Sequence, residues 1–191
     1  MELEEQRYGR NKSTVINHTY IESGEYRRKF DKISDNKELN RLLYQLAKKM
    51  LIHRSGTNIE DMYWIDPEAV EIVAEEVNQE GECGISYSDA TERTIKKYNS
   101  LITIHSHPNG EPPSANDFYC NYIYNYALGV VACHDGKVFI YKSDTDISVN
   151  HIAVSIMGYR NLHYSDYDSQ ILAIKELGSQ FDGKIIMKEM I

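Results

Sequence analysis

Residues 101–117 read LITIHSHPNGEPPSAND, and this stretch contains the strongest structural pattern of the chain. The apolar run at its start predicts a short strand that leads directly into His105 and His107. A Pro- and Gly-rich segment then ends the strand and predicts a rigid turn. Ser114 begins a predicted helix, and Asp117 lies in its first turn. The stretch therefore predicts a strand, a tight turn, and a helix that folds back toward the strand end.

The two histidines of this stretch have the spacing of a metal-binding pair. Residues two apart on a strand share a face, so His105 and His107 would have Cα atoms about 6 to 7 Å apart and side chains that can converge. Asp117 can add a carboxylate from the helix. Two nitrogen ligands and one oxygen ligand leave a fourth position open, as in catalytic zinc sites. Zinc lowers the pKa of bound water to about 7, so the pattern predicts a hydrolytic site.

Each part of this pattern also has a purely structural interpretation. An HxH pair by itself is a weak signal of metal binding. The S-x-x-D spacing of Ser114 and Asp117 resembles a capping box, in which two side chains satisfy backbone groups at the start of a helix. Capping and metal binding are compatible, and the combination of strand, HxH, turn, serine and aspartate favours a metal site.

The segment HSHPNGEPPSAND resembles the His-x-His-Pro…Ser-x-x-Asp signature of the JAMM/MPN (JAB-type) zinc metallopeptidases and of their RadC-like, phage and bacterial relatives. The motif covers residues 105–117, and the predicted order of elements extends the resemblance over residues 36–145. The chain departs from the common pattern in one respect. Nine residues separate His107 from Asp117, one fewer than is usual in the family, and we interpret this as a shortened turn.

The resemblance implies a role for each residue of the motif. His105, His107 and Asp117 would be the zinc ligands, and the Ser114 hydroxyl would stabilise the oxyanion. The family also uses an upstream glutamate as general acid and base toward the zinc-bound water. The implied reaction is hydrolysis of a peptide or isopeptide amide bond, with Zn²⁺ as cofactor. The implied substrate is a protein or peptide, with ubiquitin-like conjugates included.

Three glutamates are candidates for the catalytic acid and base. Glu60 is the best of them, because it begins the predicted strand over residues 59–65 and precedes His105 by 45 residues. Glu68, just past the end of that strand, is the second candidate, and Glu71 is the third. Two other functions remain alternatives to the metallopeptidase. They are a non-catalytic MPN-like scaffold and a RadC-like protein of a phage or mobile element.

The rest of the chain predicts an α/β fold of mixed α+β type, with a central mixed β-sheet flanked by helices. The resemblance implies the MPN fold, which is of the cytidine-deaminase-like type. Residues 1–36 are predicted to form an N-terminal arm or small subdomain, in which residues 15–16 could be a short strand. Residues 37–191 would form the hydrolase domain with a C-terminal helical extension. The predicted helices cover residues 36–51, 88–98, 114–129 and 150–180, and the predicted strands cover residues 59–65, 70–74, 101–104, 130–133, 138–141 and 184–187.

The composition of the chain argues against several classes of protein. The net charge of −8 and the pI near 5.4 argue against direct nucleic-acid binding. The basic cluster at residues 27–29 is interpreted as a solvated face. The charged N-terminus is unlike a signal peptide, and the apolar run over residues 126–133 is too short for a membrane span. An odd number of cysteines without a CxxC pair predicts no disulfide framework and a cytoplasmic protein. These cysteines are Cys83, Cys120 and Cys133.

Four further residues have both a functional and a structural interpretation. Trp64 shares a strand face with Glu60, so it could line a substrate groove or simply pack. Cys120, one turn beyond Asp117, could approach the site. The remaining two are interpreted as structural, His134 in a turn and His53 as a cation at a helix C-terminus.

Overall fold

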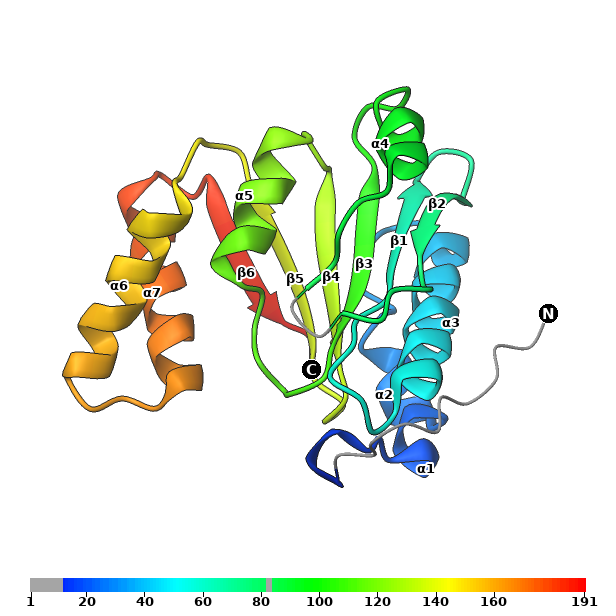
Figure 1. Cartoon of the computed structure of the whole chain (residues 1–191), viewed down its shortest axis with the longest axis horizontal. Helices are drawn as coiled ribbons and strands as arrows, with labels where there is room; N and C mark the ends of the chain where they lie inside the picture. Colours follow the sequence, from blue (N-terminus) through cyan, green and yellow to red (C-terminus); the bar gives the residue numbers. More distant parts are fainter. Residues whose placement is uncertain (1–11, 82–83) are drawn as a thin grey trace.

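The computed structural model describes residues 12–81 and 84–191, so Cys83 and the first eleven residues of the arm lie outside the described residues. The described chain forms a six-stranded sheet in the order β2-β1-β3-β4-β5-β6 (Figure 1). The β3–β4 pair is parallel, and the other neighbours are antiparallel. The strands are β1 (Met62–Asp66), β2 (Glu71–Glu76), β3 (Ile102–His107), β4 (Leu128–Cys133), β5 (Val138–Ser143) and β6 (Ile185–Glu189).

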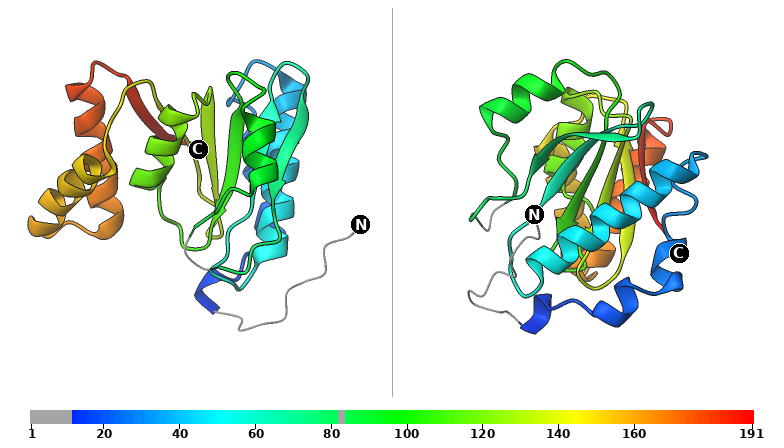
Figure 2. Two further views of the ribbon diagram at one scale, coloured as in Figure 1. Left: turned by 45° about the horizontal axis from the view of Figure 1, so that its top comes forward. Right: turned by 90° about the vertical axis from the view of Figure 1, so that its right-hand side faces the viewer.

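Helices cover both faces of this sheet. The long helix α3 runs across one face (Figure 2), and α5 packs against β4 and β5 on the other. The pair α6–α7 lies beside β6 at one end of the sheet. The predicted α/β class with a mixed sheet flanked by helices is therefore confirmed. The helices are α1 (His18–Ile21), α2 (Gly24–Arg28), α3 (Lys37–Arg54), α4 (Asp89–Ile95), α5 (Ala115–Ile123), α6 (Val149–Asn161) and α7 (Asp166–Gln180), preceded by a 3₁₀ turn at Lys12–Thr14.

Helix α3 confirms the predicted amphipathic helix. The Asn36 side chain caps it by accepting hydrogen bonds from the backbone N–H groups of Glu38 and Leu39. Its apolar stripe is buried against β3 and β4 and belongs to the core cluster on that face of the sheet. Gly56 follows the helix with φ of 80°, a left-handed conformation that favours glycine. The stripe consists of Leu39, Leu43, Leu46, Ala47, Met50 and Leu51.

Strand β3 is central to the site because all six of its residues are buried. It lies between β1 and β4, and its side chains alternate between the two faces. Ile102 and Ile104 pack in the core that contains α3. Thr103, His105 and His107 alternate with them and therefore face the side covered by α5.

Several predicted boundaries were wrong. Residues 15–16 form no strand, because Ile16 is buried in an irregular segment between the 3₁₀ turn and α1. The helix after Ser114 ends at Ile123 rather than near residue 129, because Asn125 has φ of 53° and the chain then enters β4. Strand β1 begins at Met62, so Glu60 precedes the strand.

The C-terminal part follows the prediction more closely. The predicted helical region over residues 150–180 is two helices, because the chain turns between them and Ser165 caps α7. The final strand, β6, pairs with β5. The predicted Asp135-Gly136 hairpin connects β4 and β5, and Gly136 has φ of 87°. Within the described ranges, no helix combines the length and apolar character that a membrane span needs.

Candidate metal centre

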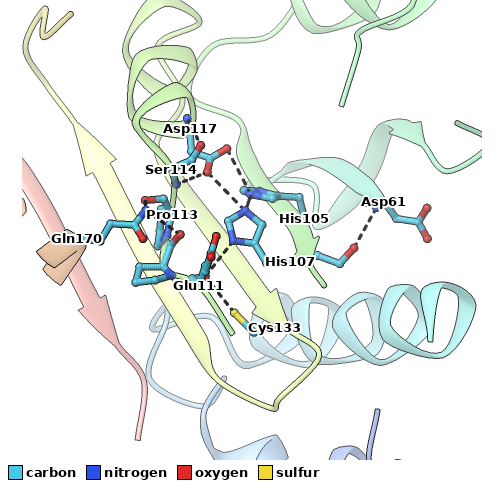
Figure 3. Close-up of polar contacts among 11 residues, drawn as sticks. Asp61, His105, His107, Glu111, Pro113, Ser114, Asp117, Cys133 and Gln170 are labelled. Atoms are coloured by element: carbon cyan, nitrogen blue, oxygen red, sulfur yellow. Dashed lines mark hydrogen bonds and ion pairs between the residues drawn. The ribbon is translucent and has the colours of Figure 1, made fainter. Parts of the chain in front are cut away.

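Three side chains from two elements converge at the end of β3 (Figure 3). His105 Nε2 lies 3.1 Å from His107 Nε2. His105 Nε2 is also 3.4 Å from Asp117 Oδ1, and His107 Nε2 is 3.6 Å from Asp117 Oδ2. Both histidines are buried, and the carboxylate comes from the first turn of α5. The two-residue spacing on β3 and the return of the chain into α5 thus bring together all three predicted ligands.

These separations fit a single metal ion. A tetrahedral zinc with bonds of about 2.0–2.1 Å separates its ligand atoms by about 3.3–3.4 Å. The 3.1 Å between the two imidazole nitrogens and the 3.4 Å from His105 Nε2 to Asp117 Oδ1 lie close to that value, and one ligand atom from each of the three residues lies within 4.8 Å of the others. Two imidazoles and one carboxylate also match the ligand types of catalytic zinc sites, and three protein ligands would leave a fourth position for water or substrate. The donor atoms of the site therefore fit Zn²⁺.

The tautomer of His107 is set by its second ring nitrogen. Nδ1 lies 2.9 Å from the carbonyl oxygen of Glu111, which can only accept a hydrogen bond. Nδ1 must therefore carry a proton, and in the neutral ring Nε2 presents its lone pair toward His105 and Asp117. A backbone carbonyl that holds the far nitrogen is a common way to orient a metal-ligating histidine.

The charges of the site favour a proton or a metal between the three side chains. Burial lowers the pKa of His107, but the hydrogen bond and charge of Asp117 outweigh it and raise the pKa to about 9. Burial raises the pKa of Asp117, and the two histidines outweigh it and hold that pKa well below the ordinary value. A divalent metal takes the place of the proton on His107, so metal binding weakens as the pH falls.

The short turn between His107 and Asp117 brings the carboxylate next to both histidines. Ser114 and Asp117 form the predicted capping box, in which Ser114 N donates to Asp117 Oδ2 at 2.6 Å and Asp117 N donates to Ser114 Oγ at 3.3 Å. Gly110 allows the turn to approach the β4–β5 hairpin, because a Cβ at this position would overlap the Asp135 carboxylate. Capping and metal binding are therefore compatible for Asp117.

Gln170, on α7, contacts the turn between His107 and Asp117 through its side-chain Nε2. It donates hydrogen bonds to the carbonyl oxygens of Pro112 and Pro113, at 3.4 and 3.1 Å. Tyr141, on β5, contacts the ring of His105 edge-on, with ring centroids 6.2 Å apart. Sequence reasoning missed both residues, because nothing in the local pattern marks a side chain that arrives from a distant element.

The three side chains open into a pocket of about 310 Å³ that Glu60 and Ser114 also line. Glu60 reaches the pocket because the residue after it pairs with Ser106, which lies between the two histidines. Asp61 N donates to Ser106 Oγ, and Ser106 N donates to the Asp61 carbonyl, both at 3.0 Å. Burial raises the pKa of Glu60, and the charge of Asp117 raises it further against the opposing effect of the two histidines.

The other two candidate glutamates lie elsewhere. Glu68 and Glu71 are exposed at the turn of the β1–β2 hairpin, and neither lines the pocket.

The remaining candidate residues differ in their relation to the pocket. Trp64 does not line the pocket, because its ring is fully buried and its Nε1 donates to Tyr126 Oη at 2.8 Å. Cys120 does line the pocket. His134 is buried, with Nδ1 2.7 Å from the Thr14 carbonyl oxygen.

Asp61, the residue after Glu60, belongs to a buried cluster of charged and polar side chains. Asp61 Oδ2 lies 2.6 Å from His53 Nδ1, and Asp61 Oδ1 accepts from Arg54 Nε at 2.6 Å. His53 and Arg54 both belong to the last turn of α3, where the positive charge of Arg54 also suits the helix dipole. The cluster joins α3 to the segment that places Glu60, and sequence reasoning did not identify it.

Replacing Asp61 with alanine should lower the free energy of unfolding by about 3 kcal/mol, because it leaves the buried Arg54 without this carboxylate. Urea denaturation of the two proteins measures the effect. The control is Glu68→Ala, which removes one exposed negative charge from the same hairpin and should change stability by less than about 0.5 kcal/mol. Equal effects of the two substitutions would show that the cluster has no special role.

Comparison of the chain with protein-family models, with curated proteins and with solved structures found no match. The resemblance to a metallopeptidase family therefore remains a prediction from the sequence, based on the motif at residues 105–117 and on the predicted order of elements.

Proposed function

We propose that the chain is a zinc-dependent hydrolase of the JAMM/MPN type, and that it cleaves a peptide or isopeptide amide bond. The observation that carries the proposal is the convergence of ligand atoms from His105, His107 and Asp117 within 4.8 Å of one another, in a pocket that Glu60 and Ser114 also line. Zinc bound there would supply a Lewis acid that polarises the scissile carbonyl and lowers the pKa of a water molecule. The finer fold assignment, an MPN arrangement of sheet and helices, belongs to the same proposal.

The protein's own residues would perform the proton transfers. Glu60 accepts a proton from the attacking water and delivers it to the leaving amine, which suits a carboxyl whose pKa is raised by burial. The Ser114 oxygen accepts a hydrogen bond from Asp117 N, so its hydroxyl proton remains available to donate to the developing oxyanion. His107 is oriented by the Glu111 carbonyl. Substrates would be peptides or proteins, with ubiquitin-like conjugates included.

A non-catalytic scaffold is the competing function. A scaffold needs neither a complete set of ligands nor a glutamate beside them. In this chain the pocket contains the three ligand side chains together with Glu60. That combination favours catalysis.

Removal of the metal tests the proposal. Zinc-loaded protein should hydrolyse members of a panel of peptides and ubiquitin-like conjugates, chelation should abolish the activity, and added zinc should restore it. Mass spectrometry of the products measures the cleavage. Activity that survives complete removal of the metal would contradict the proposed mechanism, and binding of panel members without any cleavage would favour the scaffold.

A further inference from the structure

The pocket around the candidate metal centre is lined by acidic side chains. Glu60, Glu111 and Asp117 line it, whereas no lysine or arginine does among the described residues. A divalent metal would match the negative charges of Asp117 and Glu60. The charge of Glu111 would then remain uncompensated, so the loaded pocket would carry a net negative charge next to the reacting bond.

Glu111 is fixed in place through its backbone. Its carbonyl oxygen accepts from His107 Nδ1 at 2.9 Å, which holds the residue beside the metal centre (Figure 3). Its carboxylate is exposed and has no ion pair or hydrogen bond with any other described residue. The charge of Glu111 contributes, after burial and the charge of Asp117, to the raised pKa of Glu60. Glu111 therefore offers a free negative charge at the pocket.

Another part of the lining is apolar. Met62 from β1 and Ile85 and Tyr87 from the segment before α4 line the same pocket. Met62 pairs with His105 across the β1–β3 ladder, so this apolar surface lies next to the candidate metal ligands. Long cationic side chains have the matching structure, because their aliphatic stems pack on apolar surface while the charged end reaches a polar group.

We infer that the pocket selects substrates with a lysine or arginine side chain next to the hydrolysed amide bond, and that Glu111 binds the cationic group. This inference rests on the proposed function. It concerns selectivity rather than the chemical step, so Glu111 is a specificity-determining residue. Because the Glu111 carboxylate is exposed, the preference should weaken as the salt concentration rises.

Variants of Glu111 test the inference with a mixture of synthetic peptides whose central positions are randomised. The zinc-loaded wild type should yield products enriched in lysine or arginine beside the cleaved bond, as read by mass spectrometry at low salt. Glu111→Gln should reduce the preference in kcat/KM about fivefold, the scale of a partly exposed ion pair. Glu111→Lys should reverse it toward aspartate and glutamate. The matched control is Glu68→Lys, which makes the same charge change outside the pocket and should keep the wild-type preference.

The outcomes separate this inference from the proposed function. Cleavage with the same residue preference in the wild type and Glu111→Lys would overturn the inference and leave the hydrolase intact. Failure of the zinc-loaded wild type to cleave any substrate would contradict the proposed function instead. In that case, isothermal titration of lysine- and glutamate-containing peptides into the wild type and Glu111→Lys tests the selectivity. Equal affinities would overturn the inference, and a charge preference that reverses would support it. Glu111→Gln and Glu111→Lys should both retain zinc, because the backbone of Glu111, not its side chain, contacts His107.

Discussion

Replacing His107 with alanine should reduce the zinc content of the purified protein from about one equivalent per chain to almost none. The substitution removes one of three converging ligand atoms and also the ring that the Glu111 carbonyl orients. His105 and Asp117 alone leave two protein ligands, too few for a catalytic zinc site. Metal analysis of protein purified without chelator measures the effect.

The control for this experiment is His18→Ala. His18 is exposed on α1 and is not part of the ligand group, so its loss should leave the zinc content unchanged. Circular dichroism of both variants checks that they fold, and Asp117→Asn offers a second way to remove a ligand without deleting volume. Equal zinc in the wild type and His107→Ala would mean that the metal, if any, binds elsewhere.

Replacing Glu60 with glutamine should leave zinc bound and reduce hydrolysis by about 10²- to 10⁴-fold. The amide has nearly the same shape as the carboxylate but cannot accept the proton of the attacking water. Glu60 lines the pocket without belonging to the group of three ligand atoms, so the metal should not depend on it. The measurement is kcat/KM on a substrate from the peptide panel, with zinc content determined on the same samples.

Glu68→Gln is the matched control, because Glu68 is the rival acid and base and is exposed outside the pocket. It should retain full activity. Loss of zinc from Glu60→Gln would reassign Glu60 as a ligand, and full activity in Glu60→Gln would exclude it as the base. Loss of activity in Glu68→Gln alone would move that role to Glu68.

Local patterns predicted much of the fold. The period of the apolar residues in α3, the cap at Asn36 and the turn at Asp135-Gly136 each depend on residues a few positions apart, and the structure confirms all three. The possible strand at residues 15–16 is an irregular segment, and the sequence leaves this open because a short apolar run looks the same whether it pairs in a sheet or packs as a loop. Hydrophobicity reports burial in such a run and leaves the backbone conformation open.

The convergence of His105, His107 and Asp117 follows from the sequence by itself, because a strand, a tight turn and a capped helix bring these residues together within a short span of chain. Only the tertiary structure shows that Glu60 lines the pocket and that Glu68 does not. Both glutamates flank β1, and the choice depends on the register in which β1 pairs with β3, where Met62 lies opposite His105.

That register, like the approach of Gln170 and Tyr141 to the site, depends on contacts between residues that are far apart in the sequence. Strand alternation indicates which face a side chain occupies. It does not indicate which residue of a partner strand will lie opposite, because packing of the whole sheet between α3 and α5 decides that alignment. The three candidate metal ligands are therefore brought together by the local sequence, and the residues that would act with them are brought to the site by the fold.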